Sequence, residues 1–151
     1  DLLVIATPVY IPLPGNLQNF INRLTPLLDP QIRFREGRTR AQFREDVQIS
    51  KIMMVAVGGW WESENFDTVI RIVQELAEVS GVTYGGSLIR PHAQYMRKAG
   101  QITEEGQEIL KTIEHAAQEL VQFGEIRQET LESIRRPLVT KEAFLDDWYQ
   151  S

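Results

Sequence analysis

The chain has 151 residues, of which 42% are hydrophobic and 25% charged, and its formal net charge is −5. This composition is typical of one folded globular domain, and the negative charge argues against a general nucleic-acid-binding protein. Because the chain contains no cysteine, disulfides, thiol catalysis and cysteine-ligated metal clusters are excluded from it. No apolar stretch approaches the ~20 residues of a membrane span, and the lack of cysteine fits a cytoplasmic location.

The beginning of the sequence predicts a strand, a loop and a helix. Residues 2–6 form an unbroken apolar run, which is typical of a parallel strand covered on both faces. Pro8 cannot continue a central ladder, so we expect the strand to end there. The helix is indicated by apolar residues at helical spacing, namely Leu17, Phe20, Ile21, Leu24 and Leu28. Open α/β sheets bind ligands where a strand leads through a loop into a helix.

Two more strands and two more helices follow. Residues 52–57 predict a second central strand, and the helix after it is expected to end before Gly81, a good helix-stop residue. Residues 82–89 contain a third short strand, and a last long helix is expected to reach Gly124. This alternation of strands and helices indicates a parallel sheet with helices on its faces.

The segment 125–151 predicts a helical extension in two pieces, residues 125–136 and 140–149, separated by Pro137. Its apolar residues, set among charges, favour an interface; they are Leu131, Ile134, Leu138, Phe144, Leu145, Trp148 and Tyr149. We expect this extension to pack on a second subunit of a homo-oligomer. The alternative is that it packs on its own domain.

Three short motifs lie at the carboxyl ends of the three predicted strands. The first is Thr7, Pro8, Val9 and Tyr10, and the helix after it contains Phe20 and Arg23. The second is Gly58, Gly59, Trp60, Trp61 and Glu62, followed by the tripeptide Asn-Phe-Asp at 65–67. The third is Leu-Ile-Arg-Pro-His at 88–92.

Together these motifs resemble the flavodoxin-like NAD(P)H-dependent FMN reductase family, which includes the flavodoxin-fold part of iron–sulfur flavoproteins. The resemblance covers about residues 1–123 but only the second half of the family's fold. Gln18 stands where the family usually has lysine, and Asn22 where it usually has aspartate.

The resemblance implies an α/β fold, a three-layer flavodoxin-like parallel sheet of which only the last three strands and their helices are present. Residues 1–124 would be a partial FMN-binding domain, and 125–151 the helical extension. In the flavodoxin strand order these three strands are neighbours, so the outer edge of the first strand would lack its partner. We therefore expect an N-terminal half outside this chain, or another chain, to pair with that edge.

The resemblance also implies FMN as cofactor and NAD(P)H as co-substrate, with the hydride passed through the flavin to a quinone or another small acceptor. One wall of the flavin site would be formed by Thr7, Pro8, Val9, Tyr10 and Ile11. The other wall would be formed by Gly58, Gly59, Trp60, Trp61 and Glu62. The sequence identifies no catalytic side chain, and its two histidines are too far apart to indicate a metal site.

Other functions stay open at this point. The chain could be an FMN-containing electron carrier without a substrate reaction of its own. It could also be a non-catalytic half-domain that serves in assembly, because it lacks any glycine-rich phosphate-binding motif.

Several site residues also have structural interpretations. Tyr10 could be half-buried at a strand end, one of Trp60 and Trp61 could pack inward, and Glu62 could cap the next helix. His92 lies on the ligand side of the third strand or is a polar loop residue. Five arginines between positions 33 and 44 are either a solvated connection or a patch for a cofactor phosphate; they are Arg33, Arg35, Arg38, Arg40 and Arg44.

Overall fold

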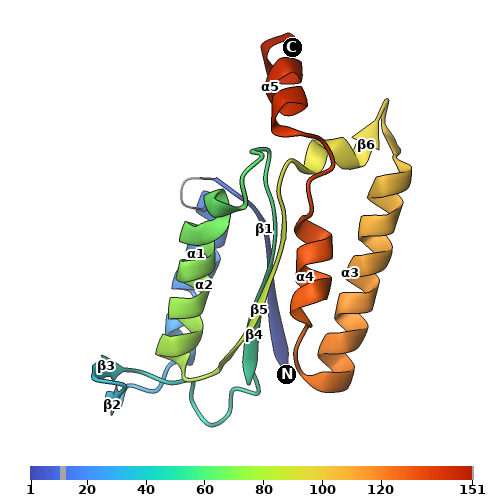
Figure 1. Cartoon of the computed structure of the whole chain (residues 1–151). Coiled ribbons are helices and arrows are strands. Elements are labelled where there is room, and N and C mark those ends of the chain that lie inside the picture. The colour runs from blue at the N-terminus through green and yellow to red at the C-terminus, as the bar shows by residue number, and fades with distance from the viewer. Residues whose placement is uncertain (11–12, 151) are drawn as a thin grey trace. The chain divides into compact units, whose positions relative to one another are not determined.

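The computed structural model describes residues 1–10 and 13–150 as a mixed α/β chain (Figure 1). A three-stranded parallel sheet has the order β1-β4-β5, and two small antiparallel hairpins accompany it. Its strands are β1 (Leu2–Pro8), β4 (Lys51–Val57) and β5 (Thr83–Arg90). The helices are α1 (Gly15–Asn22), α2 (Asp67–Ser80), α3 (Glu104–Phe123), α4 (Gln128–Arg135) and α5 (Lys141–Gln150). The predicted α/β class and the adjacency of the three predicted strands are confirmed.

Loops follow the strands at the carboxyl edge of the sheet. Two of the helices, α2 and α3, end directly before a glycine. α2 ends at Ser80 before Gly81, and α3 ends at Phe123 with Gly124 at φ 80°, so both predicted helix ends are confirmed. A glycine takes this left-handed conformation without the steric cost of a Cβ.

β1 is less buried than its apolar run predicts. Ile5 and Thr7 are buried, whereas Leu2 and Val4 on the alternate positions are exposed. The expectation of a first strand covered on both faces is therefore wrong. β1, like β5, is an edge strand of the described sheet, whereas Met54 in the middle strand β4 is fully buried.

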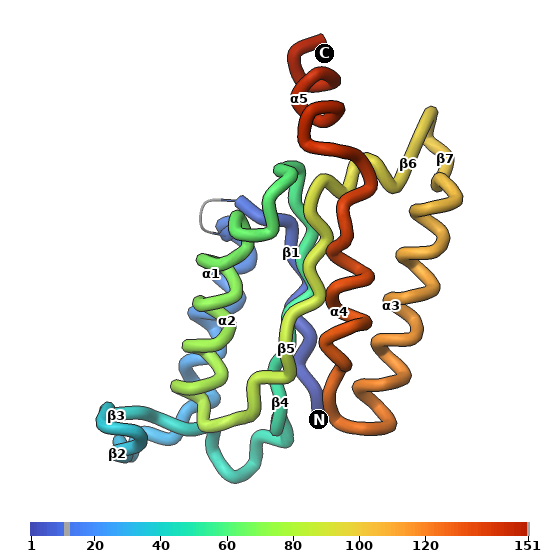
Figure 2. Tube along the Cα trace, in the orientation of Figure 1, coloured from blue at the N-terminus to red at the C-terminus, as the bar shows by residue number. Residues whose placement is uncertain are grey.

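The chain divides into two compact units. One comprises Asp1–Ala56 and Asp67–Ser87, and the other Val57–Phe66 and Leu88–Ser151. The division differs from the expected boundary at residue 124, because α4 packs against α3 within the second unit (Figure 2).

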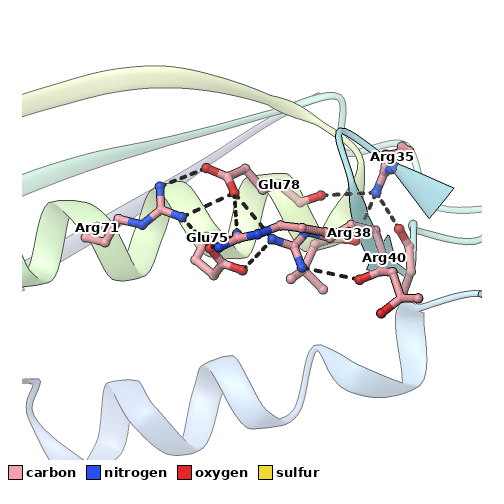
Figure 3. A network of polar contacts seen from close by, with 9 residues as sticks. Arg35, Arg38, Arg40, Arg71, Glu75 and Glu78 are labelled. Atoms are coloured by element: carbon pink, nitrogen blue, oxygen red, sulfur yellow. Dashed lines mark hydrogen bonds and ion pairs between the residues drawn. The ribbon is translucent and has the colours of Figure 1, made fainter. Parts of the chain in front are cut away.

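In the first unit, the hairpin of β2 (Arg33–Arg35) and β3 (Arg38–Arg40) is attached to α2 by arginine side chains (Figure 3). Glu75 pairs with Arg38 at 3.3 Å and with Arg40 at 2.9 Å. Arg35 donates to the backbone carbonyls of Glu78 and Val79 near the end of α2, where a cation is favourable. Arg44 pairs with Asp46. These contacts favour the structural interpretation of the arginine run over a phosphate-binding patch.

In the second unit, a buried charge of the favourable sign lies at each end of α4, one from α3 and one from β5. The Glu119 carboxylate, 2% exposed, accepts from the backbone N–H of Arg127 at the N-terminus of α4. The Arg90 guanidinium, also 2% exposed, donates to the carbonyl of Ile134 in the last turn. Each charge opposes the partial charge of that end of the helix. Burial alone would raise the pKa of Glu119, but the Thr130 hydroxyl and Arg127 together hold it below its usual value.

Candidate functional site

The loops that follow β4 and β5 are joined by backbone hydrogen bonds in the second unit. Gly58 donates to the carbonyl of Arg90 at 3.0 Å, His92 to that of Trp60 at 2.8 Å, and Ala93 to that of Gly58 at 3.0 Å. The Gln94 side chain adds a fourth bond, from Nε2 to the carbonyl of Gly59 at 3.1 Å. Carboxyl ends of neighbouring parallel strands are where α/β sheets place their ligand sites.

These contacts occupy the carbonyls of Gly58, Gly59 and Trp60, all from the side of the β5 loop. In a planar trans peptide the N–H points opposite to the C=O. The N–H groups of Gly59, Trp60 and Trp61 therefore point away from the β5 loop, and none has a partner among the described residues. We call these three groups the amide row. Successive free backbone N–H groups can bind an anion or another hydrogen-bond acceptor.

The two glycines of this loop have different reasons to be glycine. A Cβ on Gly58 would lie 2.9 Å from Cζ of Phe66, so Gly58 is required by packing inside the unit. A Cβ on Gly59 would meet nothing within 4 Å. Of the two, only Gly59 leaves open space beside the amide row.

The two tryptophans also differ. Trp60 is 54% exposed, and its ring lies 5.6 Å from that of Trp148 in α5. Trp61 donates from Nε1 to the carbonyl of Val139 at 3.1 Å and stacks on the His92 ring at 6.2 Å. Both tryptophans therefore contact residues 125–151, here called the C-terminal segment, and Trp60 is the more exposed of the two and the one available to a ligand.

Glu62 also contacts the C-terminal segment. Its carboxylate forms an ion pair of 2.6 Å with Lys141 at the start of α5, and this contact lowers the pKa of Glu62. The hydrogen bonds of the Glu62 side chain within the described residues come from Lys141, from Asn65 and from the backbone N–H of Glu62 itself. None of these contacts caps α2, so the helix-capping interpretation of Glu62 gains no support.

A buried pair, Arg90 and His92, connects the β5 loop to the C-terminal segment. Arg90 donates to the carbonyls of Ile134 and Arg136 at 2.6 and 2.9 Å, and to Nε2 of His92 at 2.9 Å. The backbone N–H of Leu138 donates to the same Nε2 at 3.1 Å. Burial, and then the charge of Arg136, lowers the pKa of Arg90 to about 10, so it stays charged at neutral pH.

His92 must be neutral to make these contacts. Because Nε2 accepts two hydrogen bonds, the imidazole proton sits on Nδ1. Nδ1 makes no well-formed hydrogen bond in the described chain, although the Trp61 backbone lies near enough to oppose part of the pKa shift. Burial, and then the Arg90 charge, lowers the pKa of His92 to about 4. His92 lies in the turn after β5, as its interpretation as a polar loop residue expects, but its side chain is buried, with 1% exposed.

The C-terminal segment is held on the second unit at several points. Ile134 in α4 and Phe144 in α5 are buried, and Tyr95 donates to the carboxylate of Asp147 at 2.9 Å. Trp148 and Tyr149 stay exposed. The segment therefore packs on its own unit, which is the alternative interpretation, and its packing on a second subunit stays a prediction.

The other group of predicted site residues belongs to the first unit. Thr7 is buried and donates from Oγ1 to the carbonyl of Pro8 at 2.8 Å, so its hydroxyl has an internal partner. Tyr10 is 62% exposed, which excludes the half-buried interpretation. Val9 is partly exposed, and Ile11 lies outside the described residues.

Comparisons with protein-family models, with curated proteins and with solved structures find no match to this chain. Across residues 1–10 and 13–150, no helix has the length and apolar character needed to cross a membrane. In the same residues, no group of three or more histidine, cysteine, aspartate or glutamate side chains could hold a metal ion. The amide row and its surroundings are therefore interpreted from their own chemistry.

The buried state of His92 predicts a loss of stability in weak acid. The pKa of a histidine is ordinarily 6.5 and falls to about 4 here, so the unfolded chain binds more protons between those values. The stabilisation is fully present above about pH 6.5 and is lost as pH falls toward 4. From about pH 7 to about pH 5 we expect a decrease in the free energy of unfolding on the order of 1–2 kcal/mol, allowing for solvent screening.

Urea denaturation of His92→Gln at both pH values tests this expectation. Glutamine can place an acceptor near the position of Nε2 without titrating, so the variant should show a smaller pH dependence than the unmodified chain. The control is His115→Gln, which removes the other histidine and keeps His92. If the free energy of unfolding of His92→Gln depended on pH as much as that of the unmodified chain, His92 would not be the group responsible.

Proposed function

We propose that this chain is part of an FMN-dependent oxidoreductase, in which a hydride passes from NAD(P)H through the flavin to a quinone or another small acceptor. The observation that carries the proposal is the amide row of Gly59, Trp60 and Trp61 at the carboxyl end of β4. The order of motifs that resembles FMN reductases supports it independently.

The amide row suits one edge of an isoalloxazine ring. The pyrimidine edge of that ring carries carbonyl oxygens and a ring nitrogen that accept hydrogen bonds and gain negative charge when the ring is reduced. Fixed N–H donors stabilise such developing charge, because they need no reorientation when it appears. FMN supplies the hydride chemistry when bound, and the loop's part is to orient and tune it. Trp60 adds an exposed aromatic face of the kind that packs on planar rings.

Residues 7–10 belong to the first unit, and their proposed role in flavin binding rests on the resemblance. The resemblance assigns them to the flavin, and the exposed ring of Tyr10 and the exposed Pro8 are compatible with that assignment. The buried Thr7 hydroxyl is already bonded to Pro8, so we assign Thr7 a structural role at the end of β1.

A non-catalytic role in assembly is the second candidate. It is favoured by the internal roles of Gly58 and Trp61, which account for two of the expected binding residues without any ligand. Flavin binding separates this candidate from the leading one. Oxidation of NAD(P)H with an artificial acceptor then separates an oxidoreductase from an electron carrier.

The first test is a visible absorbance titration of the full chain with FMN and, in parallel, with riboflavin. The sequence has no glycine-rich phosphate-binding motif, so the interactions proposed here involve the ring alone. We expect saturable binding, with dissociation constants for FMN and riboflavin that agree within about threefold, a difference of less than 1 kcal/mol. A flavin spectrum that shifts with neither compound would leave the assembly role as the better explanation.

A pair of glycine substitutions tests where the ring approaches. Gly59→Ala adds a methyl group beside the amide row where the chain itself leaves space, so it should weaken flavin binding at least tenfold without lowering the melting temperature. Gly58→Ala should instead lower stability, because its Cβ meets Phe66.

The matched control is Gly15→Ala, which also adds a Cβ in open space but at the start of α1. Unchanged flavin affinity in Gly59→Ala, with Gly15→Ala as reference, would exclude the amide row as the ring site.

A further inference from the structure

We infer that Gln94 is a positioning residue of the amide row, because its side chain sets the orientation of the peptide between Gly59 and Trp60. That orientation decides whether the Trp60 N–H faces a ligand group that accepts hydrogen bonds. The inference rests on the proposed function only in taking a flavin as that ligand.

Gln94 differs from the other groups that hold this loop. The carbonyls of Gly58 and Trp60 are held by backbone N–H groups, which nearly every amino acid would supply at those positions. The carbonyl of Gly59 is held by a side chain, Nε2 of Gln94, at 3.1 Å. Of the three peptides that make up the amide row, this is the one whose orientation depends on the identity of a side chain.

On its Gly59 side the same peptide has little other restraint. It follows Gly59, which lacks a Cβ and has no atom within 4 Å of the place where one would be. Rotating this peptide by half a turn changes ψ of Gly59, which glycine tolerates, and φ of Trp60, which the Trp60 Cβ restricts. One hydrogen bond of ordinary net strength then changes the balance between the two orientations about fivefold.

The turn before Gln94 brings its side chain to Gly59. His92 has φ 36° and ψ 47°, a left-handed conformation that is unusual for a residue with a Cβ, and the 3-10 helix Ala93–Met96 begins directly after it. His92 keeps this conformation while its ring accepts from Arg90 and Leu138. The buried pair thus sets the starting point of the segment that carries Gln94.

Two substitutions and one control test the inference in the full chain. Gln94→Met keeps the length of the side chain and removes the donor, and Gln94→Glu keeps the shape and places a carboxylate against the Gly59 carbonyl. The control is Gln122→Met, at a glutamine in α3 that is also exposed. Because position 94 is exposed, both variants are expected to fold.

The first readout needs no ligand. Nuclear magnetic resonance should show altered Gly59 carbonyl carbon and Trp60 amide nitrogen shifts in both Gln94 variants and unaltered shifts in the control. The second readout is FMN affinity by absorbance, which should fall by up to about fivefold in Gln94→Met and further in Gln94→Glu.

The two readouts separate the two proposals. Unaltered Gly59 and Trp60 resonances in both variants overturn the role of Gln94, whether or not FMN binds. Altered resonances in a chain that binds no FMN support the positioning role and overturn the flavin proposal. If the unmodified chain binds FMN and both variants bind it equally well, the role of Gln94 is overturned as well.

Discussion

Arg90 is a charged side chain buried in the second unit with no carboxylate partner among the described residues, and several other features depend on it. A buried charge is tolerated only when its hydrogen bonds are satisfied. Backbone carbonyls of Ile134 and Arg136 satisfy two of them, at the end of α4 where the helix presents partial negative charge. Arg90 therefore attaches α4 to the end of β5 through electrostatics that water does not screen.

The same guanidinium fixes the chemical state of its neighbour. With Arg90 and Leu138 both donating to Nε2, His92 can only be a neutral acceptor, and its proton lies on Nδ1. The ring is thereby held in place, and with it a left-handed backbone that directs the next residues onto the loop after β4. The position of the amide row therefore depends, through His92, on the hydrogen bonds that satisfy the buried Arg90.

Local patterns in the sequence predicted the elements well and their surroundings poorly. The apolar run at 52–57 and the glycines after α2 and α3 act over only a few residues, so they predict where the strand and the two helices lie and end. The burial of β1 depends on which strands lie beside it, which an apolar run does not reveal. Arg90 and His92 find their partners 44 to 46 residues later in the chain, so no local pattern marks them as buried. Gln94 carries no sequence signal at all, because its role follows from the orientation of a single peptide.

The loop after β4 shows why adjacent identical residues cannot share one interpretation. Gly58 is needed so that Phe66 can pack, and Trp61 holds the C-terminal segment through Val139. By contrast, Gly59 has open space where a Cβ would lie, and Trp60 is 54% exposed while its ring contacts Trp148. Each pair thus contains one residue that the fold constrains more tightly and one on the exposed side of the loop. The exposed side of the loop combines the half-exposed Trp60 ring with three backbone N–H groups that have no partner among the described residues, so it is where a ligand is best sought.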